Sequence, residues 1–541
     1  MSEVASIRPL AAVLISLVAI VLILASHRRP NVRESWSVIA AVGKFAIVLS
    51  MLPGVRDGTV YVWSYETFVP YVDLTLRADP LGMLFALLAS FLWIFTAFYS
   101  AGYMRGLSEH SQTRFFAAFA ASLSAAMGIA FAGNLITIFL FYEMLSIVTY
   151  PLVAHDEDDE ARIAGRKYLA YTFLGGGVLL LAGTALVFWL TMVHADPTIA
   201  FSPGGIAELA TAAEAAPWPA RVAFLALAIG FGVKAAIMPV HAWLPDAMVA
   251  PTPVSGLLHA VAVVKSGAFG VARVVLDVFG VDLVAELGMD VVLATLAAAT
   301  IVLASLIALR KDNLKRRLAY STVSQLSYIV LGVALLNPLA VLGGLLHMPA
   351  HAFMKLTLFF CAGAIHVETH TDDISKMAGI GKRMPLTMGA FTVAAAGMAG
   401  IPLLAGFVSK FYLVTGGIDA GMGIFAFALI VSGVLNIAYF WPVVYTAFFE
   451  TPDRYDDKPL VEHDPAPPRH LVADGGHDHH GGAPPGGWAD RSPLSESTWL
   501  MLAPITVICA GAVVLGIVPG EAVFLELIEQ IVEGAVGGVS P

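Results

Sequence analysis

The chain has 541 residues, of which 58% are hydrophobic and 13% are charged, and its formal net charge is -10. A soluble chain of this length needs roughly a quarter of its residues charged to cover its core with a hydrated surface. The composition therefore excludes a soluble enzyme, a disordered protein and a nucleic-acid binder, and lipid is expected to solvate most of the chain. The two cysteines, Cys361 and Cys509, lie far apart and provide neither a disulfide framework nor a cluster or zinc site.

Fourteen segments are long and apolar enough to cross a bilayer, because a helix needs about 20 apolar residues to span the hydrocarbon core. The first resembles a secretory signal but lacks a small-residue cleavage site, so we expect it to be retained. We predict an all-α polytopic membrane protein with about 14 transmembrane helices. In chain order the segments are 8–26, 36–52, 80–103, 114–132, 134–153, 166–193, 220–243, 256–276, 290–309, 316–335, 338–365, 386–411, 421–447 and 497–518.

The connections between the segments predict the orientation, because Lys and Arg accumulate on the inner side of the membrane. With the N-terminus outside, the inner connections hold twenty Lys and Arg residues and the outer ones hold Arg56, Arg77 and Arg221. Both ends of the chain are therefore expected outside a prokaryotic plasma membrane. The long connection 450–495 is rich in Pro, Gly, Asp and His and is expected on the inner face. Residues 521–532 could form a short amphipathic helix on the outer surface.

Charged residues inside the apolar segments are costly unless they are paired or hydrated, and they mark candidate functional groups. Arg273 is near enough to a segment end to reach the interface, and the sequence offers no account of Lys44. If there were only one buried pair, a structural ion pair between helices and a functional pair would explain the residues equally well. Four lysines and one glutamate over several segments instead favour a proton relay; they are Glu143, Lys234, Lys265, Lys355 and Lys410.

His347, His351 and Lys355 follow one another at i, i+4 and i+8 in the segment 338–365, which places them on one helix face. Three protonatable groups in line favour a relay over packing residues. Two neighbouring histidines could bind a metal, but no carboxylate lies near them, so no metal site is predicted. The tenth segment adds groups that suit a water chain and helix–helix hydrogen bonds equally well, namely Ser321, Ser324 and Gln325.

The histidines of the long connection could bind a transition metal adventitiously, but we interpret that stretch as a solvated loop. They are His463, His470, His477, His479 and His480. No nucleotide fingerprint, iron–sulfur ligand set or haem attachment motif is present, so no cofactor is predicted. Any redox chemistry would have to lie in other chains, and the chain itself is not expected to be an enzyme.

Two segments carry helix breakers beside their lysines. Lys234 precedes Pro239, and Lys410 follows Pro402 and three glycines. Proline frees a backbone carbonyl, which a membrane-embedded helix tolerates only beside protein or water. Interrupted segments in both halves of a chain point to ion sites in transporters with inverted repeats. We therefore expect broken seventh and twelfth helices and five parts: 1–112 (spans one to three), 113–276 (first five-helix repeat), 277–449 (second repeat), 450–496 (inner loop) and 497–541 (last span and tail).

Several ordered motifs resemble the antiporter-like membrane subunits of Mrp-type multisubunit cation/proton antiporters and of the proton-pumping arm of respiratory complex I. The motifs are 141–146, 234–253, 311–321, 347–355 and 406–410, and the resemblance covers about 80–450. Within this family the stretch 358–365, followed by Thr369 and His370, is most similar to the D-type subunits of Mrp antiporters. The long lateral helix that one complex I relative carries after its last spans is not expected in this chain.

The resemblance implies fourteen helices, two inverted five-helix repeats and an axis of buried charges at mid-membrane. Glu143 and Lys234 would pair in the first half-channel, and Lys265 would connect it to the second. The histidines would be the bridge, followed by the central and terminal lysines: His347, His351, Lys355 and Lys410. Some relatives carry histidine in place of Gln325 and glutamate in place of Lys410. A relay in this chain must therefore pass Gln325 by water or by the eleventh segment.

Three functions remain open at this point. The first is the proton-translocating subunit of a multisubunit monovalent cation (Na+)/proton antiporter, in which Lys234 holds a proton while Glu143 is close and releases it toward Lys265 when they separate. The second is a non-redox pumping subunit of a complex I-like quinone oxidoreductase or a membrane-bound hydrogenase. The third is a membrane scaffold. The first two imply partner subunits, protons, a lipid bilayer and, for the antiporter, a monovalent cation.

Overall fold

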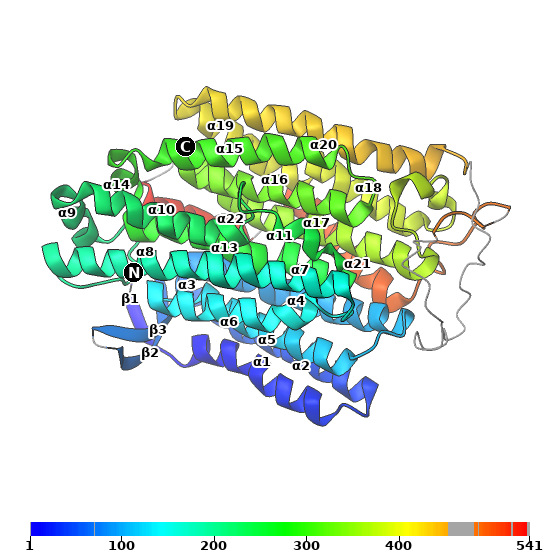
Figure 1. Ribbon diagram of the computed structural model, residues 1–541, viewed down its shortest axis with the longest axis horizontal. Helices are drawn as coiled ribbons and strands as arrows, with labels where there is room; N and C mark the ends of the chain where they lie inside the picture. Colours follow the sequence, from blue (N-terminus) through cyan, green and yellow to red (C-terminus); the bar gives the residue numbers. More distant parts are fainter. Residues whose placement is uncertain (1, 70, 453–480, 485, 521–522, 538–541) are drawn as a thin grey trace.

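The computed structural model describes residues 2–69, 71–452, 481–484, 486–520 and 523–537. Its helices lie side by side in one bundle (Figure 1), with α1 (Arg8–Ala25) and α2 (Pro30–Leu49) at one edge and α19 (Ala405–Asp419) and α20 (Gly423–Phe449) at the other. The long helix α17 (Pro338–Thr369) packs against α16, α18, α19 and α21 and is buried along most of its length. The five loop histidines between 463 and 480 lie outside the described residues.

The remaining elements of the first half are α3 (Leu52–Arg56), α4 (Pro80–Gly106), α5 (Gln112–Ala130), α6 (Leu135–Val153), α7 (Asp159–Leu169), η1 (Ala170–Gly176), α8 (Gly177–His194), α9 (Ala207–Ala215), α10 (Pro217–Lys234), α11 (Trp243–Asp246), η2 (Ala247–Val249), α12 (Thr252–Gly256), η3 (Leu257–Val261), α13 (Val263–Arg273) and η4 (Val274–Phe279). Those of the second half are α14 (Val281–Glu286), α15 (Met289–Ala308), α16 (Leu314–Ala334), η5 (Ile374–Lys376), η6 (Ile380–Lys382), α18 (Pro385–Ala399), α21 (Trp499–Ile517) and α22 (Val523–Ala535).

Each of the fourteen apolar segments is helical over most of its length in the structure. Within the described part of the chain, ten helices are long and apolar enough to cross a membrane by length and composition. The other four segments correspond to α10, α12–α13, α16 and α18–α19, which are interrupted, short or begin with a basic turn. The chain is an all-α membrane protein, with one small sheet among the described residues.

Several long helices begin where the sequence supplies a cap. Asp79 precedes α4 and accepts a hydrogen bond from the backbone N–H of Gly82 at 2.8 Å. Asn134 caps α6 and Asn313 caps α16 in the same way. Such side chains satisfy backbone donors that have no partner in the first helical turn. The capping residues therefore fix where these helices start.

A three-stranded sheet that the sequence analysis did not predict lies at the end of the bundle that holds the N-terminus (Figure 1). Strand β1 (Ser2–Ala5) pairs in parallel with β2 (Thr59–Val69), with Ser2 opposite Thr59. Strand β3 (Val72–Ala78) pairs antiparallel with β2, with Tyr61 opposite Ala78. Strand β2 is rich in β-branched and aromatic residues, which favour strands.

Contacts between connections divide them into two groups at opposite ends of the bundle. At one end, ion pairs and hydrogen bonds join connections that the sequence predicts to be inner: Arg33–Gln112, Arg114–Glu157, Arg316–Glu160 and Asp312–Ser375. At the other end, contacts join the sheet, the connections predicted to be outer and α22: Arg77–Glu3, Asn134–Asp73, Leu135–Ile199 and Arg56–Glu526. The first strand and the last described helix thus lie at the same end of the bundle. Helix α22 buries its apolar face against α4 and α17.

Two charged residues have surroundings that the sequence did not reveal. Arg273 does not reach the interface: its side chain is 2% exposed and forms ion pairs with Asp79 and Asp277, both at 2.7 Å. Lys44 is fully buried, donates a hydrogen bond to the carbonyl oxygen of Leu123 at 2.7 Å and lies 4.9 Å from the ring centroid of Trp93. Both therefore hold helices together at sites away from the predicted relay.

Candidate functional site

Two interruptions of the helical backbone lie beside relay lysines. Helix α10 ends at Lys234 itself, and α18 ends at Ala399 before α19 begins at Ala405. Each interruption holds a non-glycine residue in the left-handed region, Ala236 with φ 56° and Leu403 with φ 70°. Such a conformation costs of order 1 kcal/mol and persists only when the surroundings enforce it. The interruptions therefore expose backbone carbonyls inside the bundle, where ammonium groups can use them.

Lys234 and Glu143 lie together beside the first interruption. The Lys234 ammonium donates a hydrogen bond to the carbonyl oxygen of Tyr142 at 2.5 Å and lies 3.4 Å from the centroid of the Tyr142 ring. Lys234 is fully buried, and Glu143, the next residue on α6, is half-buried and interacts electrostatically with it. No ion pair within 4.0 Å joins these two described residues. The two residues thus interact electrostatically without a direct ion pair, and the Lys234 ammonium contacts Tyr142 instead.

The Glu143 carboxylate packs against the start of α8. A Cβ on Gly177 would lie 2.7 Å from the carboxylate carbon and 2.7 Å from Oε1, closer than side chains normally approach. The π-helical turn η1 directly precedes this glycine. Such turns arise within α-helices and are frequent at functional sites. The combination of the wide turn and the missing side chain therefore makes room for the carboxylate between α6 and α8.

At the centre of the bundle, Lys265 and the two histidines of α17 form a connected cluster. The Lys265 ammonium lies 2.5 Å from His351 Nδ1. The His351 ring lies 6.0 Å, centroid to centroid, from that of His347. His347 contacts Gln325 Oε1 through Nε2 at 3.0 Å and Ser409 Oγ through Nδ1 at 2.9 Å. All of these side chains are fully buried. The sequence placed both histidines on one face, and the structure shows which groups they meet.

Lys410 joins this cluster through an aromatic ring. Its ammonium donates a hydrogen bond to the carbonyl oxygen of Met398 at 2.5 Å. That carbonyl would normally accept from the residue four positions later, which is Pro402 and has no N–H. The ammonium also lies 5.2 Å from the ring centroid of Tyr328, and this ring stacks on His347 at 5.1 Å. The terminal lysine is therefore adjacent to His347 rather than to Lys355.

Lys355 occupies a branch of the cluster. It is fully buried, donates to the carbonyl oxygen of Leu318 at 3.2 Å and to the hydroxyl of Ser321, and lies 5.6 Å from the ring centroid of Phe440. Its interaction with Lys265 is electrostatic. The neighbouring Ser324 instead bonds to Ser305 and Ser432, which joins helices α15, α16 and α20. Of the polar residues on α16, Ser321 and Gln325 thus contact relay groups and Ser324 does not.

His259 belongs to the same region and was missed in the sequence analysis. It is fully buried in the π-helical turn η3, 4.7 Å from the ring of Phe359, and it interacts electrostatically with Lys355 and Lys265. Neither of its ring nitrogens has a hydrogen-bond partner among the described residues. The sequence could have indicated His259 as a histidine inside an apolar segment. The π-helical turn that brings it near the lysines, however, depends on tertiary packing.

The two clusters are not joined by direct polar contacts. Among the described residues, no hydrogen bond or ion pair links Lys234 at the first interruption to Lys265 in α13. Helix α13 nevertheless packs against the end of α10, so the two lysines lie on adjacent elements. A proton that passes between them needs water or a movement of one side chain.

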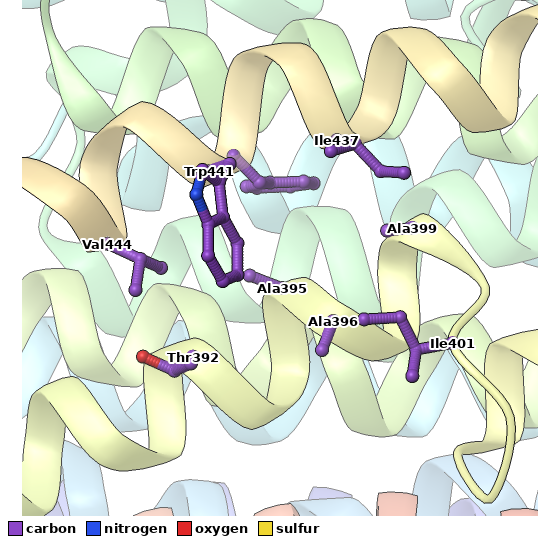
Figure 2. Close-up of a pocket in the computed structure, with 9 residues that line it drawn as sticks. Thr392, Ala395, Ala396, Ala399, Ile401, Ile437, Trp441 and Val444 are labelled. Carbon is purple, nitrogen blue, oxygen red and sulfur yellow. The ribbon is translucent and has the colours of Figure 1, made fainter.

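A cleft near Lys355 is apolar. It has a volume of about 260 Å³ between α18 and α20, and Figure 2 shows Trp441 pointing across it toward Ala395. The polar side-chain groups in its lining are the indole N–H of Trp441 and the hydroxyl of Thr392, which donates a hydrogen bond to the carbonyl oxygen of Met388. Phe440 lines the cleft and also lies beside Lys355. The cleft thus lacks ligands for an ion and is suited to hydrocarbon.

The sequence of the chain is similar to those of known membrane proteins. The family model described as the transmembrane part of NADH:quinone oxidoreductases and Mrp antiporters matches residues 132–436. The N subunit of the NADH-quinone oxidoreductase of Desulforudis audaxviator is 33% identical over 468 residues, which are 84% of this chain and 84% of that protein. The A/B subunit of a probable K(+)/H(+) antiporter of Rhizobium meliloti is 31% identical over 437 residues, which are 79% of this chain and 42% of that protein.

A solved structure shares the fold. A chain of the Mrp complex from Dietzia sp. matches with a TM-score of 0.80 and 22% sequence identity, covering 98% of this chain and 97% of that one. The protein is thus an integral multi-pass membrane protein with an antiporter-like, proton-translocating architecture. It belongs to the family of membrane subunits shared by NADH:quinone oxidoreductases and Mrp antiporters, whose members are parts of multisubunit membrane complexes.

Proposed function

We propose that the chain is the proton-translocating subunit of a multisubunit monovalent cation (Na+)/proton antiporter, equivalent to the D-type subunits of Mrp antiporters. The observation that carries the proposal is the set of buried contacts from Lys265 through His351 and His347 to Lys410. Buried ionisable groups are rare in membrane helices and mark ion pathways. A scaffold would have no need of so many unpaired ammonium groups within one bundle.

The proposed proton path starts at the first interruption. While the Glu143 carboxylate is close to Lys234, its negative charge favours the protonated lysine. When the carboxylate moves away, the buried ammonium loses that support and releases its proton toward Lys265, with water filling the gap between the clusters. His351, in contact with Lys265, takes the proton next, and His347 passes it toward Ser409 and Lys410.

Lys355 and His259 enter this scheme as a side branch. Both interact electrostatically with Lys265, so a change of charge on any one of the three alters the charge preferred by the others. In this order Lys410 follows His347, whereas the sequence analysis put Lys355 between them. The proposal retains Glu143, Lys234, Lys265, His347, His351, Lys355 and Lys410 as relay residues and adds His259.

The proposal includes the membrane arrangement. Fourteen crossings, with the pairs α12–α13 and α18–α19 each forming one, place the sheet and α22 outside the cell and the connection after α20 inside. The interruptions at Lys234 and Lys410 would then occupy equivalent places in two inverted five-helix repeats, 113–276 and 277–449. The excess of Lys and Arg at the end opposite the sheet supports this orientation.

An alternative proposal is the non-redox pumping subunit of a quinone oxidoreductase or hydrogenase complex. The similarity to a component of an NADH-quinone oxidoreductase over 84% of the chain favours it. Purification of the complex with its partners separates the two: proton movement driven by a Na+ gradient supports the antiporter, and movement that requires an electron donor supports the redox complex.

The relay itself is tested in everted vesicles that contain the whole complex. Glu143→Gln keeps the shape of the side chain but removes its charge, and we expect cation-driven proton movement to be lost while assembly persists. Lys234→Ala and Lys234→Arg should fail as well, since a guanidinium does not release its proton. Asp159→Asn is the matched control, because that carboxylate is 97% exposed at the end of the bundle. Ordinary proton movement in assembled Glu143→Gln complexes would contradict the relay.

A further inference from the structure

A second group of polar residues lies at the bundle end opposite the sheet, away from the relay. The connection between α4 and α5 supplies Glu109 and His110, and the connection between α6 and α7 supplies His155. Arg114 holds the two connections together, since it donates to the carbonyl oxygen of His155 at 3.0 Å and forms an ion pair with Glu157. Residues about 45 positions apart in sequence are thus brought side by side.

The side chains of this group converge. One potential ligand atom from each of Glu109, His110 and His155 lies within 4.8 Å of the other two. Glu109 Oε2 lies 4.0 Å from His110 Nδ1, and the two imidazole rings lie 4.8 Å apart at 75°. The side chain of His110 is 47% exposed, so it can rotate toward the other two. Three protein ligands arranged in this way would leave one coordination position of a bound metal ion open to water.

His155 provides the second, independent observation. It is fully buried, with its ring against Phe115 and His110, yet neither of its ring nitrogens has a hydrogen-bond partner among the described residues. Buried polar atoms without partners are rare in native proteins and call for an explanation. An imidazole whose two nitrogens have no protein partner is available to coordinate a metal ion.

We propose that Glu109, His110 and His155 bind a divalent transition metal of the zinc class at this end of the bundle. Two imidazoles and one carboxylate are a ligand set that Zn²⁺ accepts, with water in the fourth position. Mg²⁺ and Ca²⁺ prefer oxygen ligands and fit two imidazoles poorly. The acidic run from Asp156 to Glu160 adds negative potential beside the site. The site ties the α4–α5 connection to the end of α6, the helix that carries Glu143, but it uses no relay residue.

The test must first remove the histidines of the long connection, which could bind metal themselves. In a background with His463, His470, His477, His479 and His480 all changed to alanine, the intact complex is stripped with a chelator and titrated with Zn²⁺ against a chromophoric chelator. We expect one Zn²⁺ equivalent that Mg²⁺ does not displace. Adding His155→Ala or His110→Ala should weaken it by more than about 100-fold, beyond the effect of losing a residue that only supports a ligand.

His27→Ala is the matched control, because this histidine is exposed and is not one of the three proposed ligands. If His155→Ala prevents assembly, zinc binding is measured in the variants His110→Ala and Glu109→Gln instead. Zinc affinity that is unchanged in His110→Ala and Glu109→Gln would overturn the proposal, as would the absence of a zinc equivalent in the loop-histidine background. Proton movement in vesicles plays no part in this readout, so failure of the relay and failure of the metal site are distinguishable.

Discussion

The close packing of Gly177 against Glu143 predicts the effect of adding a single methyl group at the relay. In Gly177→Ala, the new Cβ would lie 2.7 Å from the Glu143 carboxylate. Ordinary van der Waals contact begins at 3.4 Å, so the carboxylate must move away by about 0.7 Å. Gly177 has helical backbone angles, so alanine should stabilise the helix by roughly 0.5–1 kcal/mol. The variant should therefore assemble normally.

The expected effect on function follows from the separation of the two charges. If the two charges approach to about 4 Å in the close state of the proposed cycle, holding them about 0.7 Å further apart changes their interaction by about 0.6 kcal/mol at an effective dielectric constant near 20, or about threefold in an equilibrium. We therefore expect cation-driven proton movement in everted vesicles to change severalfold, most simply as a fall of about threefold. Thermal stability of the purified complex should be equal to or above that of the unmodified protein.

Gly175→Ala is the matched control. It lies in the same π-helical turn, and its nearest neighbour, the carbonyl oxygen of Ala170, is already at 3.4 Å. Equal losses of proton movement in Gly177→Ala and Gly175→Ala would show that the π-helical turn, and not the position of the Glu143 carboxylate, determines the rate. An unchanged rate in Gly177→Ala would refute the position of Glu143 or its role.

Three further changes test the surrounding structure. Arg273→Met leaves the buried carboxylates of Asp79 and Asp277 without their cation, and should lower the free energy of unfolding by about 3–5 kcal/mol, seen as poor assembly or a lower Tm. Glu496→Ala removes the carboxylate that accepts hydrogen bonds from the N–H groups of Leu386 and Thr387 at the start of α18, a loss of about 1–2 kcal/mol measurable by Tm or hydrogen exchange. Lys44→Met replaces a buried ammonium that contacts no relay residue, so proton movement should stay near the unmodified rate.

Two of these changes have a counterpart variant that isolates the cause of the loss of stability. Glu526→Ala breaks an exposed ion pair with Arg56 and should alter stability by less than about 0.5 kcal/mol, in contrast to Glu496→Ala. Arg273→Lys keeps the positive charge and should retain part of the lost stability. Loss of transport in an assembled Lys44→Met complex would show that the relay extends into the first two helices.

The sequence alone determined the features that depend on local order along the chain. Long apolar segments predicted the helices, because each helix satisfies its own backbone hydrogen bonds in lipid. Proline beside Lys234 and Lys410 predicted where helices end, because proline removes a backbone donor. The i, i+4 spacing placed His347 and His351 on one face.

Only the tertiary structure decided which of these groups meet. Whether Lys410 faces Tyr328 or Lys355, whether Arg273 reaches solvent or two buried carboxylates, and whether His155 meets Glu109 all depend on how distant helices pack. A π-helical turn that aims His259 is likewise a response to packing, and the sheet joins strands β1 and β2, which are more than fifty residues apart. Hydropathy and spacing constrain one segment at a time, whereas burial and hydrogen bonding between segments are set by the bundle as a whole.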